Sequence, residues 1–525
     1  PKSRQRGRPI IGTEGWIRTF TQAQFIAFYD AWYRPERMAV IVVGHVDGAT
    51  AARLIGETLG GIAARGTARS EPADLIPAEA ARPNVAIFSD PGLVGVGLTF
   101  EHPFAAPRLA DTHARLTIAL HRSLAFAMFH NRLQRLAHEP GASFVTPSAV
   151  LSPSLPGWQT ATLSVGGKID DWRQVAAEIE HEHRRAFQFG FTATELREAK
   201  AGFVTAYEEA VRTAPTWPSG WLANRLAGCL LSGAVFAAPE ALQRDLVAEL
   251  EAATLDDCLR GFREAWTAQA PHVLAVANPA FQITRAQIAE ALNQSRRTEV
   301  AAREERAPPP AFAYAGDKPP GRLVQEENVA DLAVRLAAFA NGVRFNFKPT
   351  TYDADAVFVH VRVGEGKLLQ PENRPGLDVL ANTVLLPGGL GQHTAQQLAE
   401  ILTGHTVNLA FHIEPDACVF EGRCARRELP LCLQLIAAYL GDAAYRPDTM
   451  REARGEFGAI FASFAASPGG PISFQALRQL AGGDRRFGFP EWDELLSRNL
   501  DDLKTWLEPQ FKRGAIELSV VGDIT

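Results

Sequence analysis

Thirteen histidines are the first residues to inspect for chemistry in this 525-residue chain, because imidazole is a common metal ligand and general base. None of them begins H-x-x-E-H or H-E-x-x-H, in which two histidines one helical turn apart bind zinc and a glutamate activates water. His181-Glu-His183 places its imidazoles on different sides of a helix, which is typical of a solvated helix face. His393 is expected at a helix start or on the surface, with contact to a peptide as the alternative. We therefore expect no catalytic residue and no metal ligand in this chain.

Glycine-rich stretches and cysteines indicate no further chemistry. Gly388-Gly-Leu-Gly391 lacks the Lys-Ser/Thr pair of a phosphate-binding loop, so it predicts a turn between helices. Gly364-Glu-Gly-Lys367 lacks the first glycine and the hydroxyl of such a loop. The five cysteines are odd in number, lack C-x-x-C spacing and are best interpreted as small buried hydrophobic residues: Cys229, Cys258, Cys418, Cys424 and Cys432.

The bulk composition excludes several classes of protein. A hydrophobic content of 46% and a charged content of 21% are ordinary for a globular protein and exclude a disordered or fibrous one. The net charge of −6 provides no basic field, so we expect no nucleic-acid partner. No run approaches the roughly 18 apolar residues that a membrane helix needs, and we expect no membrane span. The nearest candidate, Leu226 to Pro239, is short and interrupted by glycines.

One order of elements, a helix and then a strand, occurs three times. Near the start, Thr21 to Gln24 has capping-box spacing before a helix. Met38 to Gly44 follows as a predicted buried strand, and a further helix begins near Thr50. The aromatic residues at helical spacing in the first helix are Phe25, Phe28, Tyr29 and Trp32.

The two later copies define a repeat. A capped helix begins at Thr254 and precedes the strand His272 to Ala277, and a last helix over 500–511 precedes the strand Ala515 to Gly522. The strands end roughly 240 residues apart, which indicates an internal structural repeat. Strand-like patterns at 84–100 and 332–363 open the two later units, and the second includes the hairpin signal Asn341-Gly342.

These patterns predict an α+β fold of repeated two-layer modules, each a mostly antiparallel sheet packed by helices. Residues 1–80 are the rear part of a first module, and residues 81–295 are a complete second one. Residues 296–324 are a linker, in which alternating charges at 303–306 and proline clusters predict a semi-rigid, solvated tether. Residues 325–525 are a third module, truncated at its C-terminus.

Several motifs resemble the pitrilysin/insulinase family of zinc metallopeptidases, which bear the inverted motif H-x-x-E-H. Tyr33 to Met38, followed by Val42-Val-Gly44, is similar to the family's Y-x-P-x-N-M turn and V-V-G-D strand. Leu124 to Leu133 is similar to the family helix that carries an R-L pair before a hairpin. The resemblance continues in order through Gly376-Leu377, Gly388 to Gly391 and Thr394 to Leu402.

The resemblance implies a central, non-catalytic part of a long bacterial family member. In such proteins four modules form two halves that close around a peptide, and 296–324 corresponds to the hinge between the halves. The family pattern G-x-A-H-x-x-E-H falls on 376–383, so the ligand positions are Val379 and Thr383 and the base position is Asn382. These residues imply no cofactor in this piece. Zinc then belongs to a catalytic half-module expected before Pro1, and a fourth module is expected after Thr525.

The resemblance also implies a substrate, and alternatives remain open. The substrate is a peptide or unfolded polypeptide, held by strand addition near Gly141, Phe144 and Val145, unless this is an ordinary hairpin of the fold. The alternative function is an inactive paralogue that scaffolds a separate peptidase subunit. A peptide-binding module without peptidase ancestry is a further alternative. A periplasmic location is suggested by the resemblance only.

Overall fold

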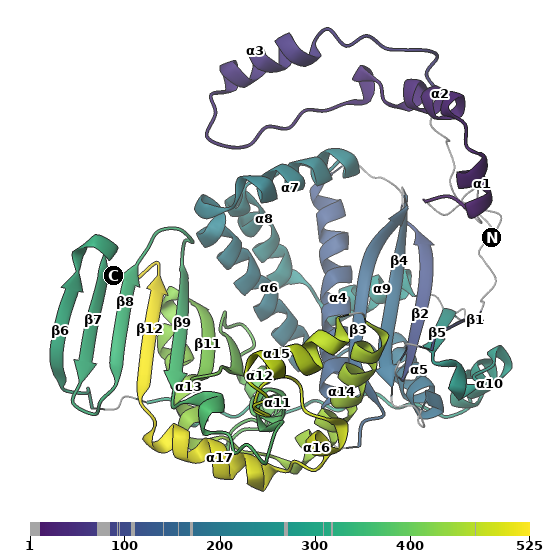
Figure 1. The fold of residues 1–525 in the computed structure, drawn as a ribbon. Coiled ribbons are helices and arrows are strands. Elements are labelled where there is room, and N and C mark those ends of the chain that lie inside the picture. The colour runs from purple at the N-terminus through teal and green to yellow at the C-terminus, as the bar shows by residue number, and fades with distance from the viewer. Residues whose placement is uncertain are drawn as a thin grey trace.

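The computed structural model describes an N-terminal helical segment and two helix-packed sheets joined by a linker (Figure 1). Residues 1–10 and 71–80 of the predicted first module, and residues 308, 317 and 318 of the predicted linker, lie outside the described residues. No described helix has the length and apolar character required to cross a membrane. The described residues are 11–70, 85–91, 93, 95–106, 111–139, 141–155, 157–167, 172–266, 271–307, 309–316, 319–467 and 469–524.

The N-terminal segment contains α1 (Glu14–Thr19), α2 (Gln22–Trp32) and α3 (Gly48–Leu59). The predicted capping box is confirmed, since the Thr21 hydroxyl accepts the Gln24 N–H at 3.3 Å and the Gln24 side chain accepts the Thr21 N–H at 2.9 Å. The predicted buried strand at Met38–Gly44 is wrong. A strand needs a neighbour for its backbone hydrogen bonds, and no described strand pairs with this stretch.

The first sheet has five strands in the order β1-β5-β2-β4-β3. Only β1 and β5 are parallel, and the other pairs are antiparallel. Val96, Leu98 and Phe100 alternate toward the core, because successive side chains of a strand point to opposite faces. The strand bounds are β1 (Val85–Ser89), β2 (Val96–Ala105), β3 (Phe144–Leu155), β4 (Trp158–Gly167) and β5 (His272–Ala277).

Helices pack on this sheet around one hydrophobic core. The longest, α4 (His113–Ala137), buries Leu124, Phe129 and Leu133 completely. A capping box formed by Thr192 and Glu195 begins α6 (Ala193–Thr213). The remaining helices are α5 (Trp172–Phe189), α7 (Ser219–Ser232), α8 (Pro239–Ala252), α9 (Leu255–Ala265) and α10 (Arg285–Ser295).

The second sheet has seven strands in the order β10-β11-β9-β12-β8-β7-β6. Only β12 and β8 are parallel. The Asn341-Gly342 hairpin is confirmed between β7 and β8, and Gly342 has the positive φ of 88° that such a turn requires. The strand bounds are β6 (Leu323–Val329), β7 (Val334–Phe339), β8 (Arg344–Pro349), β9 (Ala356–Val363), β10 (Asn408–Ile413), β11 (Cys418–Ala425) and β12 (Ile516–Gly522).

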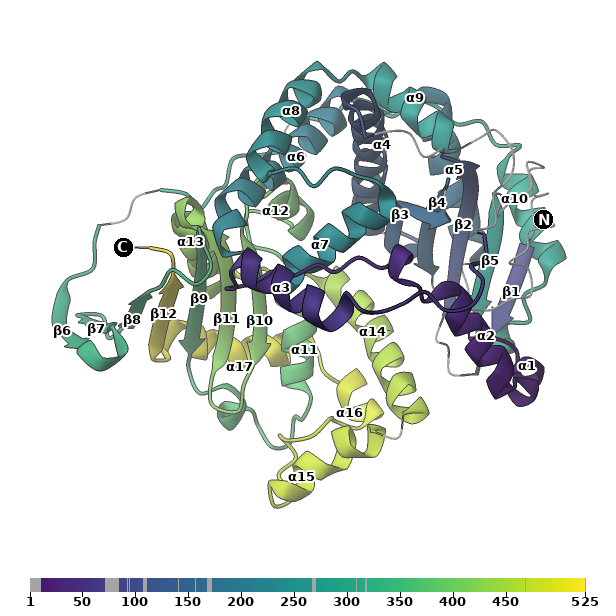
Figure 2. The same cartoon turned by 90° about the horizontal axis from the view of Figure 1, so that it is seen from above.

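Helices cover the part of this sheet around β9 to β11, whereas β6 to β8 extend beyond them (Figure 1). The predicted α+β fold of two-layer, mostly antiparallel modules is confirmed. Figure 2 shows α6 and α12 where the two halves meet. The helices of this half are α11 (Leu377–Val384), α12 (Ala395–Ile401), α13 (Leu429–Asp442), α14 (Pro447–Ala466), α15 (Leu477–Leu480), α16 (Trp492–Leu496) and α17 (Leu500–Arg513).

Candidate functional site

The predicted degenerate motif lies on α11, and its side chains have structural roles. The Asn382 side-chain oxygen accepts the backbone N–H of Ile413 at 2.9 Å, which ties α11 to the edge strand β10. The Thr383 hydroxyl donates to the carbonyl of Val379 one turn earlier, at 3.0 Å. The Val379 side chain packs against the hydrophobic core of this half.

These residues do not fit a zinc ion. Zinc is held by thiolate, imidazole or carboxylate groups, whereas this face of α11 offers an isopropyl group, an amide and a hydroxyl. The amide oxygen and the hydroxyl proton are already used in hydrogen bonds. Among the residues that the structure describes, no group of three or more His, Cys, Asp or Glu is arranged to hold a metal.

The predicted substrate-binding residues lie around the start of β3. Phe144 belongs to the core with 2% of its surface exposed, whereas the Val145 side chain is 41% exposed. Gly141 lies in the preceding turn with a φ of 89°, a conformation that favours glycine. Of the side chains of Phe144 and Val145, Val145 is therefore the one available to a ligand.

Strand β3 is an edge strand, but part of its outer edge is occupied. The Ala149 N–H donates to the Nδ1 atom of His130 at 3.3 Å, and the Pro147 carbonyl accepts from the Gln134 amide at 2.9 Å. Pro147 and Pro153 also lack the N–H that a ladder needs. These features blunt the edge along 147–153. The register shift between Val145 and Ser148 separates this stretch from the predicted binding residues.

A buried ion pair anchors the start of α6. The Arg132 guanidinium donates two hydrogen bonds to the Glu195 carboxylate, at 2.7 and 2.6 Å, and Arg135 adds a third at 3.0 Å. Burial favours the neutral acid, but the hydrogen bond and charge of Arg132 outweigh it and lower the pKa of Glu195. The same carboxylate accepts the Thr192 N–H at 2.9 Å. Glu195 therefore joins α4 to the first turn of α6.

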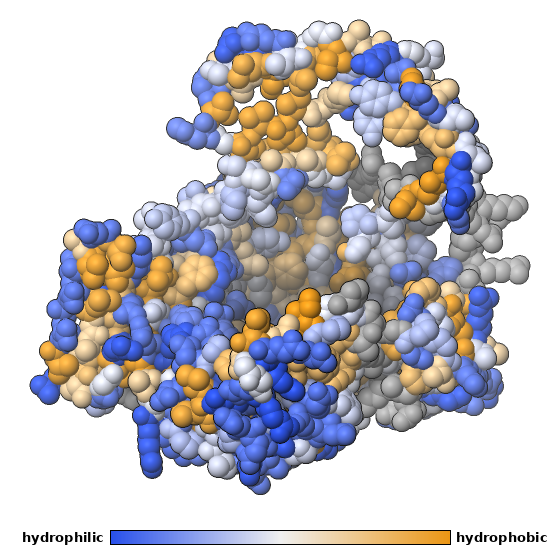
Figure 3. All heavy atoms as spheres, in the orientation of Figure 1, coloured by the Kyte–Doolittle hydropathy of each residue, from blue (hydrophilic) through white to orange (hydrophobic). Residues whose placement is uncertain are grey.

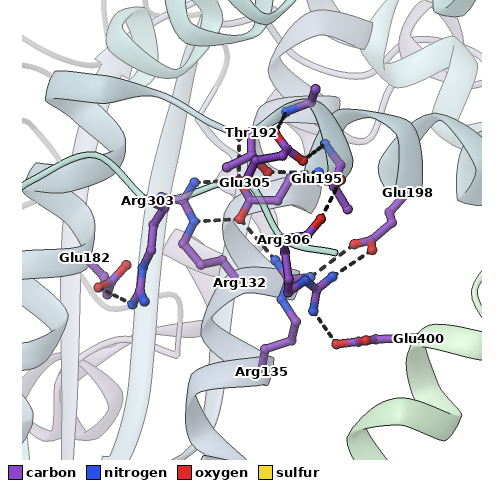
Figure 4. A network of polar contacts seen from close by, with 12 residues as sticks. Arg132, Arg135, Glu182, Thr192, Glu195, Glu198, Arg303, Glu305, Arg306 and Glu400 are labelled. Atoms are coloured by element: carbon purple, nitrogen blue, oxygen red, sulfur yellow. Dashed lines mark hydrogen bonds and ion pairs between the residues drawn. The ribbon is translucent and has the colours of Figure 1, made fainter. Parts of the chain in front are cut away.

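The linker adds its own charges to this network (Figure 4). Arg303 donates to the buried Glu182 at 2.7 Å. The Glu305 carboxylate accepts the N–H groups of Ala193 and Thr194 at 3.0 and 2.9 Å, at the positive end of the α6 dipole. Residues 303–305 are exposed, in line with the predicted solvated tether, but Arg303, Glu305 and Arg306 are tied to the modules by these contacts rather than free. These charges pack because buried acids and free helix N–H groups lie within reach.

Arg306 connects the two halves. It donates to Glu198 of α6 at 2.8 Å and also pairs with Glu400 of α12. Further along α6, the Thr205 hydroxyl donates to the Gly404 carbonyl at 2.8 Å. Arg212, near the end of α6, pairs with Asp355 of the second half. One helix thus contacts the second half along most of its length.

The two histidine predictions need correction. His393 precedes α12 as expected, but it is 2% exposed rather than on the surface. Its Nε2 atom accepts the N–H of Ala313 at 2.8 Å, and its ring stacks on Phe312, so it holds the linker at these two residues. The partners lie 80 residues away in the sequence, and no local pattern near His393 indicates them.

The predicted solvated face at 181–183 is also wrong, because other elements pack against α5. Glu182 is 5% exposed. The His183 ring lies 4.6 Å from the Trp266 ring, and burial lowers the pKa of His183 to about 4. An imidazole with such a pKa is uncharged at neutral pH.

The remaining motifs behave as structural elements. Gly388 to Gly391 lies in the loop between α11 and α12, as predicted. Four of the five free cysteines are buried, and Cys229 is half-buried. Burial raises the pKa of the Cys258 and Cys418 thiols to about 12, which leaves both unreactive at neutral pH.

Apolar side chains of the N-terminal segment face outward. Phe25 is 64% exposed and Phe28 is 49% exposed, and about half of Val40 and Val42 is also exposed. Figure 3 shows hydrophobic side chains gathered over this segment, next to the hollow at the centre of the view. Contiguous exposed apolar surface of this kind marks an interface.

Comparisons with known proteins relate this chain to a family of peptidases. Residues 19–203 match the family model described as the peptidase M16 inactive domain. The probable zinc protease PqqL of Escherichia coli is 26% identical over 239 residues, which cover 45% of this chain and 25% of that protein. The chloroplastic stromal processing peptidase of Arabidopsis thaliana is 23% identical over 209 residues, covering 39% of this chain and 16% of that protein. The match thus spans a quarter or less of these relatives.

Two solved structures share the fold over the whole chain. A mutant of the ferredoxin protease FusC, in complex with Arabidopsis ferredoxin, superposes with a TM-score of 0.62 at 17% identity. The match covers 100% of this chain and 58% of the FusC chain. The periplasmic protease PqqL from Escherichia coli superposes with a TM-score of 0.52 at 18% identity, covering 99% of this chain and 58% of the other.

Proposed function

Because the chain belongs to the M16 peptidase family, whose inactive domain it carries at residues 19–203, we propose that it forms non-catalytic walls and the hinge of a zinc metalloendopeptidase. The parent enzyme encloses peptides and hydrolyses them with zinc held outside this chain. A relative named as a probable zinc protease supports the zinc chemistry of the parent.

Asn382 carries this proposal. It occupies the place where the family motif has its general base, yet its side chain holds the backbone of β10. An amide cannot take a proton from water as a carboxylate does. Helix α11 is therefore a structural part of the proposed non-catalytic wall, and other residues stand at the positions of the catalytic groups.

The proposed organisation assigns 1–80 to the rear of a catalytic-type first module and 81–295 to a complete second module. Residues 296–324 form the hinge and 325–525 a non-catalytic third module. A half-module of the same chain is the proposed partner of the N-terminal segment. Two features support this proposal: the exposed apolar residues of the segment and the unpaired stretch at 38–44. A fourth module is proposed to follow the third.

The proposed substrate is a peptide or unfolded polypeptide, bound near Gly141, Phe144 and Val145. The blunted edge at 147–153 favours contact at Val145 and the preceding turn over strand addition along all of β3. The capture of ferredoxin in the FusC complex supports a protein-derived substrate. A periplasmic location is proposed from the periplasmic PqqL structure.

The second candidate is an inactive paralogue that scaffolds a separate peptidase subunit. The exposed apolar surface of the N-terminal segment also suits a partner chain, so it does not separate the two candidates. The coding sequence upstream of Pro1 does. An H-x-x-E-H motif there decides for the single-chain enzyme, and its absence decides for the scaffold.

The non-catalytic role is tested by elemental analysis and peptidase assays on the purified chain. We expect substoichiometric zinc and no cleavage of an unfolded polypeptide, while a zinc endopeptidase assayed in parallel cleaves it. One zinc per chain, together with cleavage that a chelator abolishes, would refute the proposal.

The binding role is tested separately with a fluorescently labelled unfolded polypeptide. Val145→Asp should weaken binding, as measured by fluorescence anisotropy, because a charge replaces an apolar contact. Val150→Asp is the matched control, since Val145 and Val150 lie on the same strand and are 41% and 42% exposed. Equal weakening by both variants would contradict the proposed location.

A further inference from the structure

Two thiols lie close together in the core of the second half. Cys424 is on β11, on the same face of the strand as the buried residues Phe420 and Gly422, because alternate residues of a strand share a face. Cys432 is near the start of α13, which packs on β11. Both cysteines belong to the same hydrophobic core and are shielded from solvent.

Gly422 makes room for the Cys432 sulfur beside Cys424. A Cβ atom at Gly422 would lie 2.6 Å from the Cys432 Sγ atom, so only glycine fits there without a shift of the cysteine. Gly422 and Cys424 are two residues apart on one face of β11, which places the Cys432 side chain next to that of Cys424. The hydrogen bond between the two thiols raises the pKa of Cys424 and lowers the pKa of Cys432. The two side chains are therefore neighbours, as a disulfide requires.

The connection between the two cysteines is short. Only the turn Arg426–Glu428 lies between the end of β11 and the start of α13. The entropic cost of bringing two residues together grows with the length of the chain between them, so this pair closes at low cost. The same turn contacts the first half of the molecule, because Arg427 pairs with Glu208 of α6 at 3.3 Å. A covalent link between the cysteines would fix the corner that carries this contact.

We propose that Cys424 and Cys432 form a disulfide that joins β11 to α13. The two thiols lose two protons and two electrons, and one S–S bond forms. The oxidant is a second disulfide, such as that of oxidised glutathione or of a thiol–disulfide oxidoreductase, and it is reduced to two thiols.

The exchange has two steps. The thiolate of one cysteine attacks the oxidant, which gives a mixed disulfide and releases one thiol of the oxidant. The thiolate of the other cysteine then attacks the mixed disulfide and releases the second thiol. Both steps take place while the chain folds, before α13 covers β11, because Cys424 is 2% exposed and Cys432 is 0% exposed in the folded chain.

Alkylation of the chain tests the bond directly. The reduced, unfolded chain is refolded in a buffer of reduced and oxidised glutathione, and the folded product is alkylated in guanidinium chloride without a reductant. Peptide mass spectrometry should find Cys229, Cys258 and Cys418 alkylated, and Cys424 cross-linked to Cys432. A second preparation, exported to the oxidising periplasm of a bacterium and alkylated in the same way, should give the same result without a refolding step. Alkylation of both Cys424 and Cys432 in the folded chain from either preparation would overturn the proposal.

Sensitivity to a reductant provides a second test. In urea titrations followed by hydrogen exchange of α13, a reductant should lower the unfolding midpoint of the oxidised chain by up to about 1 M, because the unfolded chain regains conformational freedom. Cys432→Ala should abolish this shift.

Cys418→Ala is the matched control, since Cys418 lies on the same face of β11 and is also 0% exposed. This variant should keep the shift. Each variant is compared with itself in the presence and absence of the reductant, so the loss of one buried thiol cancels. A shift that persists in Cys432→Ala, or no shift in the wild type, would overturn the proposal.

Discussion

Glu195→Gln tests whether the ion pair at the start of α6 stabilises the first sheet and its helices. Glutamine keeps the shape of the side chain but removes the charge that Arg132 faces. Arg132 is 3% exposed, so water does not replace the lost partner. The variant therefore leaves a buried guanidinium without its counter-charge.

The contacts of Arg132 determine how much the free energy of unfolding should fall in Glu195→Gln. Removing one partner of a buried ion pair costs about 3–5 kcal/mol. Arg132 retains a hydrogen bond to the Gly190 carbonyl at 3.1 Å and its position 5.1 Å from the centre of the Phe191 ring. These remaining contacts place the expected loss near the lower limit, at about 3 kcal/mol.

The pH dependence provides a second measure. The folded-state pKa of Glu195 lies below its ordinary value of 4.5, so its stabilisation is complete above that pH. The stabilisation is lost as the pH falls through the folded-state pKa. The difference between wild type and variant should therefore stay constant from about pH 8 to 5 and shrink below about pH 4.5.

The assay is urea-dependent hydrogen exchange of peptides from α4 and α6, which reports the free energy of unfolding of this region. Glu240→Gln is the control, since Glu240 lies exposed in the first turn of α8 and should change stability by less than about 0.5 kcal/mol. A loss below about 1 kcal/mol for Glu195→Gln, or a difference that already shrinks between pH 7 and 5.5, would refute the reasoning.

Three further predictions concern other parts of the chain. Asn382→Ala should lower the free energy of unfolding by about 1–3 kcal/mol, because the Ile413 N–H loses its acceptor. The rate of hydrogen exchange in β10 should therefore rise, and an unchanged rate would contradict the prediction. Arg306→Gln should weaken the contact between α6 and α12 by about 1 kcal/mol, and by a smaller amount at high salt. Hydrogen exchange of the backbone of α12 measures this change. An effect of the same size at high salt would contradict an electrostatic origin. His183 has a folded-state pKa of about 4, below its ordinary 6.5, so it resists protonation in the fold. The free energy of unfolding should fall by about 2.5 kcal/mol between pH 6.5 and 4. His183→Gln should remove this fall in urea titrations, and a fall that persists in the variant excludes His183 as its cause.

The sequence predicted those features that depend on nearby residues. The caps at Thr21 and Thr254, the Asn341-Gly342 turn and the strand-like pattern that includes β2 each need only a few neighbours in the chain. The fold class followed from the order of such elements. The positions of the degenerate motif, Val379, Asn382 and Thr383, were also located from the local sequence. Their structural roles depend on contacts with residues that are distant in the sequence, such as Ile413.

The errors all concern contacts between residues far apart. His393 and His183 look solvent-exposed, and Arg303, Glu305 and Arg306 look free of partners, when only their own segments are considered. Each is buried or paired through an element more than about 75 residues away, such as Ala313 for His393. The strand predicted at Met38–Gly44 failed for the opposite reason, because its hydrophobic pattern was correct but no described strand lies beside it. A local sequence pattern indicates which secondary structure a segment is able to form. Contacts with the rest of the protein determine whether the segment forms it.

The packed linker sets the length of the connection between the two halves. Arg303 and Glu305 are attached to the second module, and Arg306 touches both halves. While these contacts hold, the free span of the linker begins only after Arg306. Release of residues 303–306 would add about 13 Å of extended chain. The contacts of Arg303, Glu305 and Arg306 thus shorten the part of the linker that is free to extend if the two halves move apart.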